Sequence, residues 1–260
     1  MGKCALLIHG MWGTSEVWGD WRVFLEAHGW AVLTPSLRHH EAAPLKPPPE
    51  LGTTGLADYA RDLEILLRGL PEKPVIVGHS MGGLIALKLC ARGLARAGVL
   101  LTPAPPSSVL ALRVSNVLAF ARIERQWGWW RKSHRATLKE ALWHTFNTMD
   151  PREAGRLHGT FVHDSGRALL EMGLPWLDRT AAARVAPADV TVPLLIVAGQ
   201  RDRLTPPSVV RCIADRFDGA EYREYPGQGH WVLGQPGWHE IAADAAQWMD
   251  RQWQSSTSPN

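Results

Sequence analysis

A serine flanked by glycines is the first candidate for chemistry. Ser80 stands in Gly78-His79-Ser80-Met81-Gly82-Gly83, after the β-branched run Val75–Val77 and before the helix-compatible run Leu84–Arg92. A turn between a strand and a helix strains the serine backbone and lifts the hydroxyl above the carboxyl edge of a sheet. The glycines keep the turn clear of the neighbouring strand and helix. We therefore predict that Ser80 is a nucleophile.

A serine hydroxyl is a weak nucleophile unless a base, usually a histidine oriented by a carboxylate, removes its proton. In an open parallel sheet, these partners must follow other strands at the same edge. Asp202 comes directly after the fifth predicted strand and His230 after the sixth, and the loop 101–106 after the fourth strand offers no carboxylate. We predict that Ser80, Asp202 and His230 act together, in the chain order of a nucleophile elbow.

The other histidines are weaker candidates for the base. His79 is expected to point away from the nucleophile because of the turn geometry. The remaining competitors lie in a proline-rich loop or in an inserted region: His39, His40, His134, His144, His158 and His163.

The negative charge that forms on a carbonyl oxygen during attack needs two hydrogen-bond donors. The Met81 N–H, at the start of a helix, is one candidate, because helix N-termini favour anions. The second is the Met11 N–H in His9-Gly10-Met11-Trp12-Gly13, where Gly10 lets the backbone turn inward. His9 is expected to brace this loop rather than to react.

The elements that must position these residues alternate between strands and helices. Nearly continuous apolar strands indicate a sheet buried on both faces. We predict an α/β fold with a doubly wound, mainly parallel sheet of about six strands, at 4–8, 30–34, 75–77, 97–102, 193–198 and 221–225. Residues 1–102 and 189–253 form the core, residues 103–188 an inserted helical cap without strands, and residues 254–260 a flexible tail.

Thirteen tryptophans stand out in the composition, and several fall near the predicted site or in the cap. Trp12 and Trp231 flank the catalytic loops and are expected to line a pocket for an apolar or aromatic group. Trp130 and Trp176, in the predicted cap, are candidates for the same pocket. Packing of the cap helices against the core explains these two residues equally well. The apolar stretch 109–121 fits either a lid that contacts lipid or ordinary core packing.

Length, charge and cysteine content narrow the class of protein. A chain of 260 residues fits one domain with an insertion, and a net charge of +3 with scattered cations does not indicate nucleic-acid binding. Three cysteines without CxxC spacing favour a reducing compartment. With no signal-peptide pattern and no membrane-spanning run, we expect a cytoplasmic protein that acts on a small molecule. Its oligomeric state stays open.

The motifs His9-Gly10 with Gly13, Gly78–Gly83, Gly199 with Asp202, and Gly229-His230 resemble the α/β-hydrolase superfamily, in its small bacterial serine esterase and lipase-like branch. The resemblance covers about 4–102 and 192–253. It implies a Ser80–His230–Asp202 triad, an acyl-enzyme, no cofactor or metal, and a cap over the site. The two strands that usually precede the His-Gly loop are absent, and Ser36–His40 replaces a turn that usually contains glycine.

The expected reaction is hydrolysis of carboxylic esters, and the residues leave three alternatives open. One is cleavage of an amide, carbamate, lactone or carbon–carbon bond by the same triad. Another is a perhydrolase similar to the cofactor-free haloperoxidases. The last is a binding protein without catalysis, although such proteins commonly lose a triad residue and none is lost here.

Overall fold

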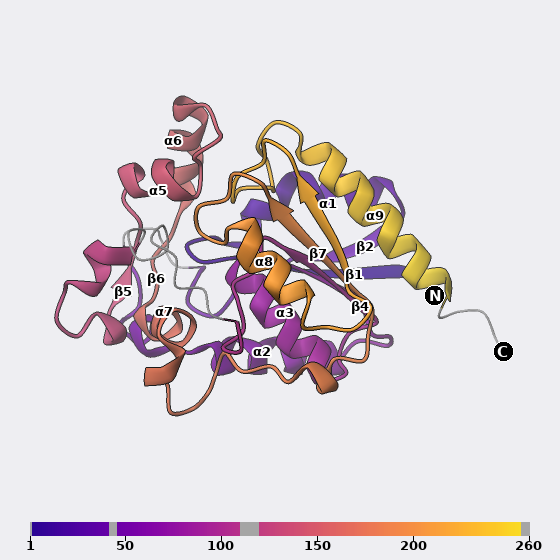
Figure 1. The fold of residues 1–260 in the computed structure, drawn as a ribbon, viewed down its shortest axis with the longest axis horizontal. Coiled ribbons are helices and arrows are strands. Elements are labelled where there is room, and N and C mark those ends of the chain that lie inside the picture. The colour runs from indigo at the N-terminus through magenta and orange to yellow at the C-terminus, as the bar shows by residue number, and fades with distance from the viewer. Residues whose placement is uncertain (1, 42–45, 110–119, 256–260) are drawn as a thin grey trace.

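The computed structural model describes residues 2–41, 46–109 and 120–255, and it is built around a six-stranded sheet (Figure 1). The strands are β1 (Lys3–Ile8), β2 (Trp30–Leu33), β3 (Val75–His79), β4 (Ala97–Leu101), β7 (Leu194–Gly199) and β8 (Glu221–Tyr225). Their order is β2-β1-β3-β4-β7-β8, and every neighbouring pair is parallel. The predicted fold class and strand positions are confirmed.

Helices cover both faces of this sheet, which is why all of its strands except the edge strand β8 are mainly apolar without alternation. The helices are α1 (Gly19–Ala27) and α9 (Trp238–Ser255) on one face, and α2 (Leu56–Arg68), α3 (Met81–Ala91) and α8 (Pro207–Ala214) on the other. Along β1, Ala5 and Leu7 join the core under α1 and α9, whereas Leu6 and Ile8 join the core under α2, α3 and α8. Short 3₁₀ turns, η1 (Ser15–Trp18) and η2 (Pro49–Thr53), precede α1 and α2.

The segment between β4 and β7 forms mostly short helices that gather at one end of the sheet, to its left in Figure 1. Its described elements are η3 (Trp129–Arg131), β5 (Ser133–His134), α5 (Leu138–His144), α6 (Pro151–Thr160), β6 (Asp164–Ser165), α7 (Gly166–Gly173), η4 (Pro175–Leu177) and η5 (Pro187–Asp189). The expectation that this segment has no strands was wrong, because β5 and β6 pair antiparallel. A strand of two residues is too short to show the alternating hydrophobic pattern by which strands are recognised in a sequence.

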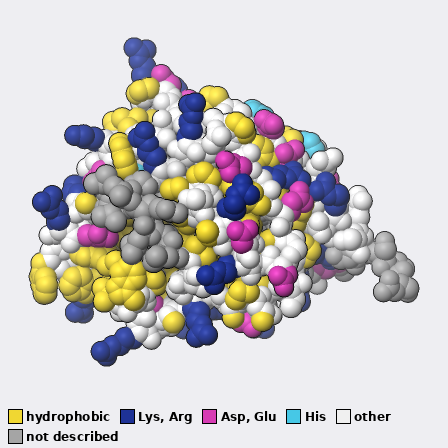
Figure 2. Space-filling model, in the orientation of Figure 1, with side chains coloured by type: hydrophobic (Ala, Val, Ile, Leu, Met, Phe, Trp, Pro, Cys, Tyr) yellow, Lys and Arg dark blue, Asp and Glu magenta, His cyan; other side chains and the backbone are white. Residues whose placement is uncertain are grey.

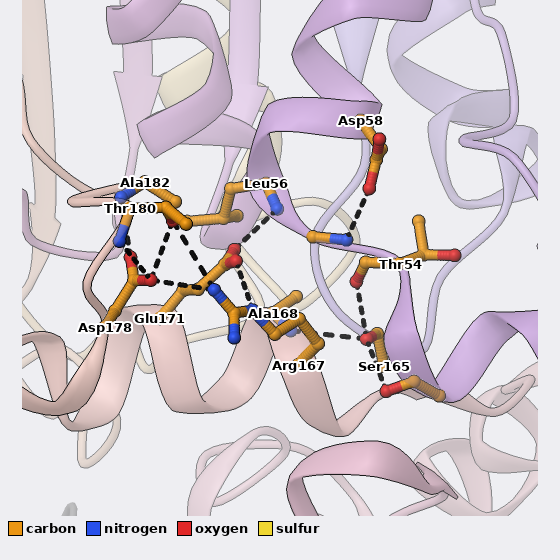
Figure 3. Close-up of polar contacts among 12 residues, drawn as sticks. Thr54, Leu56, Asp58, Ser165, Arg167, Ala168, Glu171, Asp178, Thr180 and Ala182 are labelled. Atoms are coloured by element: carbon orange, nitrogen blue, oxygen red, sulfur yellow. Dashed lines mark hydrogen bonds and ion pairs between the residues drawn. The ribbon is translucent and has the colours of Figure 1, made fainter.

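Buried polar contacts join α7 to the core (Figure 3). The Leu56 N–H, at the first residue of α2, donates to Glu171 Oε2 over 2.7 Å, so a carboxylate of the segment between β4 and β7 sits at a helix N-terminus, where negative charge is favoured. Arg167 Nε donates to the other oxygen of Glu171 at 2.6 Å. Ser165 Oγ donates to the Thr54 carbonyl at 2.6 Å. This part of the inserted segment is therefore fixed to the core by hydrogen bonds.

Two sequence expectations reach into residues that lie outside the described part of the chain. The apolar stretch 109–121 falls mostly there, as do residues 256–260 of the predicted tail, while α9 continues through Ser255. Within the described residues, no helix has both the length and the apolar character needed to cross a bilayer.

Candidate active site

Ser80 occupies the tight turn between β3 and α3 with φ +54° and ψ −119°, a conformation that residues other than glycine rarely adopt. The turn is closed by glycines for a steric reason. A Cβ on Gly78 would lie 2.2 Å from the Gly82 carbonyl oxygen, and a Cβ on Gly82 would lie 2.2 Å from the Ile8 carbonyl oxygen. The Ser80 N–H donates to the Leu101 carbonyl at 3.0 Å, which ties the strained turn to β4.

Asp202 and His230 meet at the same edge of the sheet, in the loops after β7 and β8. His230 Nδ1 lies 2.7 Å from Asp202 Oδ2, and both side chains are buried. The other oxygen, Oδ1, accepts the N–H groups of Leu204 at 2.7 Å and Thr205 at 2.9 Å. A Cβ on Gly199 would lie 2.2 Å from the Gly229 carbonyl oxygen, so the two loops meet only because Gly199 has no side chain. The carboxylate is thus fixed, and it holds the imidazole through Nδ1.

The histidines next to His230 are uncharged. His79 Nε2 donates to the His230 carbonyl at 2.9 Å, so this nitrogen is engaged by the backbone. Burial and the neighbouring His230 lower the pKa of His79 to about 3, and the same two causes lower the pKa of His144 to about 3. Neither ring therefore adds a positive charge to the site at neutral pH.

Two backbone N–H groups are available near Ser80. Met81 is the first residue of α3, so its N–H has no acceptor within the helix. The Met11 N–H has no hydrogen-bond partner among the residues that the structure describes, and Met11 lines the same cavity as Ser80. A Cβ on Gly10 would lie 2.9 Å from Ser80 Cβ, so the loop after β1 approaches the serine as closely as glycine permits.

His9 braces this loop, as the sequence predicts. Its Nε2 accepts the Leu37 N–H at 3.0 Å, and its Nδ1 donates to the Gly10 carbonyl at 2.9 Å. Burial and the nearby His40 lower the pKa of His9 to about 3. The ring is therefore neutral at neutral pH, which leaves Nε2 able to accept the Leu37 N–H.

A cavity of about 450 Å³ opens above Ser80 and His230. Its walls come from the core and from the inserted segment, and they are mainly apolar, with Phe120, Leu169 and Leu174 among them. One charged side chain, Glu124, is found among the described residues of the lining, and burial raises its pKa.

The four tryptophans proposed for the pocket have different positions. Trp12 and Trp231 line the cavity and are buried, and Trp176 lines it with 59% of its surface exposed. Trp130 is not part of the lining, because its ring packs edge-on against Trp127 and Trp129.

Sequence reasoning missed Thr205, whose hydroxyl lies 2.8 Å from Asp202 Oδ2 and 3.4 Å from His230 Nδ1. Its place three residues after an aspartate is typical of a turn in which the carboxylate accepts backbone N–H groups, and this signal was available. In the part of the chain that the structure describes, no group of three or more His, Cys, Asp or Glu side chains is arranged to hold a metal ion.

The sequence profile of the Alpha/beta hydrolase family matches residues 5–243 of this chain. A pimeloyl-[acyl-carrier protein] methyl ester esterase from Xylella fastidiosa is 28% identical over 233 residues, covering 83% of this chain and 90% of the esterase. A monoacylglycerol lipase from Mycolicibacterium smegmatis is 32% identical over 94 residues, which span 35% of this chain and 31% of the lipase. Among solved structures, a monoacylglycerol lipase from Paleococcus ferrophilus has a TM-score of 0.70 at 21% identity, covering 96% of this chain and 94% of that one. At this level of identity, the similarity to the Paleococcus ferrophilus structure shows a shared fold alone.

Proposed function

This chain belongs to the alpha/beta hydrolase family and is a hydrolase of carboxylic esters, and we propose that it cleaves them through an acyl-enzyme formed on Ser80. The observation that carries the proposal is the 2.7 Å contact between His230 Nδ1 and Asp202 Oδ2, at a cavity that Ser80 and His230 both line. The curated relatives, an esterase and a lipase by name, support ester bonds as the target.

In the proposed mechanism, Ser80 Oγ attacks the ester carbonyl while His230 Nε2 takes its proton. Asp202 holds the proton of His230 on Nδ1, which leaves Nε2 free to accept, and stabilises the imidazolium that forms. The Met11 and Met81 N–H groups donate to the oxyanion of the tetrahedral intermediate. His230 then protonates the leaving alcohol, and a water molecule activated by the same imidazole releases the acid.

The cavity favours substrates without a negative charge near the ester. Its mainly apolar lining suits an aliphatic or aromatic group, and the carboxylate of Glu124 repels an anionic one. We propose that Trp12 and Trp231 contact this group from the core and Trp176 from the inserted segment. Residues 103–188 then act as a cap that completes the substrate pocket over the triad.

The test compares Ser80→Ala with Ser108→Ala on p-nitrophenyl esters of increasing acyl length. Ser108 also lines the cavity, and its buried hydroxyl has no partner among the described residues, so its loss removes no hydrogen bond to any of them. We expect Ser80→Ala to lower kcat by at least about 10⁴-fold and Ser108→Ala to change it less than threefold, with both variants folded. Retained turnover in Ser80→Ala would contradict the proposed nucleophile.

A second panel separates the ester reaction from the other reactions that this triad supports. Matched amide, lactone and carbamate substrates are assayed beside the ester with the same acyl group. A higher kcat/KM for any of these than for the ester would reassign the bond that is cleaved.

A further inference from the structure

Trp12, the residue after the proposed oxyanion donor Met11, has an unusual backbone held by the cap. Its φ is +64°, a region that residues with a side chain rarely adopt. Both of its backbone polar groups bond to the segment between α6 and α7. The Val162 N–H donates to the Trp12 carbonyl at 2.9 Å, and the Trp12 N–H donates to Asp164 Oδ2 at 2.9 Å. These contacts from the cap hold the strained conformation.

Asp164 is fully buried and its charge is balanced by a residue of the core. His40 Nε2 lies 3.0 Å from Asp164 Oδ2, and neither side chain reaches solvent. His40 Nδ1 donates to the Arg38 carbonyl at 3.0 Å, which fixes the ring with Nε2 at ion-pair distance from the carboxylate. Burial alone would lower the pKa of His40, but the Asp164 carboxylate outweighs it and the pKa is raised. Burial likewise opposes the charge on Asp164, yet His40 and the backbone N–H donors lower its pKa.

The position of Asp164 is itself fixed. The neighbouring Ser165 donates its hydroxyl to the Thr54 carbonyl, a contact visible in Figure 3, and its N–H bonds Asp164 Oδ1 at 2.7 Å. Together, Asp164 and Ser165 form β6, which pairs with β5. The carboxylate is therefore a rigid support rather than a surface group that happens to reach the loop.

We propose that Asp164, with His40 as its counter-ion, is a positioning residue that aims the Met11 N–H at the oxyanion. The inference rests on the proposed function. Peptide units are planar, so a loop held at two points has little freedom between them. His9 holds the loop on one side through Leu37, and Asp164 holds the Met11–Trp12 peptide on the other. The cap thereby contributes to the reaction itself as well as to the pocket.

The structure offers a closely matched control. Glu171 is also a buried carboxylate of the cap that accepts a backbone N–H of the core and pairs with a cation, but it bonds α2 instead of the loop after β1. Glu171→Gln therefore weakens the attachment of the cap without touching Trp12. Asp164→Asn keeps an oxygen acceptor, whereas Asp164→Ala removes the acceptor altogether.

The experiment measures kcat and KM for a p-nitrophenyl ester, together with inhibition by an aryl trifluoromethyl ketone, which forms an oxyanion on the serine. We expect Asp164→Ala to lower kcat about 10–100-fold with KM within threefold, and Asp164→Asn to lower it less. Affinity for the ketone should fall by the same factor as kcat, while affinity for the corresponding alcohol stays constant. Glu171→Gln should keep kcat within about twofold of the wild type.

Unchanged kcat in both Asp164 variants, or an equal loss of kcat in Glu171→Gln, would overturn the inference. If Asp164→Ala does not fold, Asp164→Asn and His40→Gln carry the same comparison. Amide hydrogen exchange of the peptide that contains Met11 and Trp12 gives a readout independent of turnover. Exchange should accelerate in the Asp164 variants, and unchanged exchange would count against the inference. A wild-type protein without esterase activity would contradict the proposed function instead.

Discussion

Replacement of Asp202 by asparagine tests the proposed role of Asp202, which is to keep the proton of His230 on Nδ1. Oδ1 of Asp202 accepts two backbone N–H groups, so the amide oxygen of the variant must take that place and the NH₂ group must take the place of Oδ2. That NH₂ group would then donate toward His230 Nδ1, over the 2.7 Å that the carboxylate spans now. The proton of the imidazole moves to Nε2, the nitrogen that must accept from Ser80.

We expect Asp202→Asn to lower kcat about 10⁴-fold, which corresponds to about 5.4 kcal/mol of lost transition-state stabilisation. The assay is p-nitrophenyl ester hydrolysis at saturating substrate, with the thermal unfolding midpoint measured beside it. Asp178→Asn is the control, because Asp178 is a buried aspartate of the cap that also accepts backbone N–H groups. A folded Asp202→Asn with kcat within tenfold of the wild type would refute the reasoning.

Three further outcomes are expected. Gly82→Ala should lower the free energy of unfolding by at least about 3 kcal/mol in urea titrations, because the added Cβ would lie 2.2 Å from a carbonyl oxygen of β1. The control Gly155→Ala, whose Cβ would enter open space on α6, should raise the free energy of unfolding by up to about 1 kcal/mol. Glu124→Gln should raise kcat/KM about tenfold for an ester with a carboxylate-terminated acyl chain, while the neutral ester of equal length stays unchanged. The raised pKa of His40 means that its stabilising contribution is complete below its unfolded pKa of about 6.5 and is lost as pH rises through the folded value. The stability difference between wild type and His40→Gln should therefore be largest near pH 5–6 and shrink toward pH 9, and a difference that grows with pH would contradict the ion pair.

The elements of the fold that leave a regular hydrophobic pattern in the sequence were predictable from it. Five of the six strands appear as mainly apolar runs, and parallel pairing follows because both faces of the sheet are covered by helices; the edge strand β8, Glu221–Tyr225, carries charged residues instead. Ser80, Asp202 and His230 were proposed to act together because the carboxyl ends of parallel strands meet at one edge. The positions of these residues in the chain were sufficient, and no side-chain contact had to be foreseen.

The contacts that depend on distant segments were not predictable. Asp164 lies 152 residues from the loop it supports, and nothing in its neighbours marks it. His40 was considered only as a competing base in a proline-rich loop, whereas the structure buries it against Asp164. Trp130 shows the same limit, since its place in the chain assigned it to the predicted cap but could not give the direction of its ring.

Covalent labelling with a fluorophosphonate, followed by mass analysis of the labelled peptide, tests the central claim most directly. The account predicts one adduct per chain, on Ser80, with esterase activity lost in proportion to labelling and no adduct in Ser80→Ala. An adduct on another residue, or full esterase activity in a chain labelled at Ser80, would contradict it.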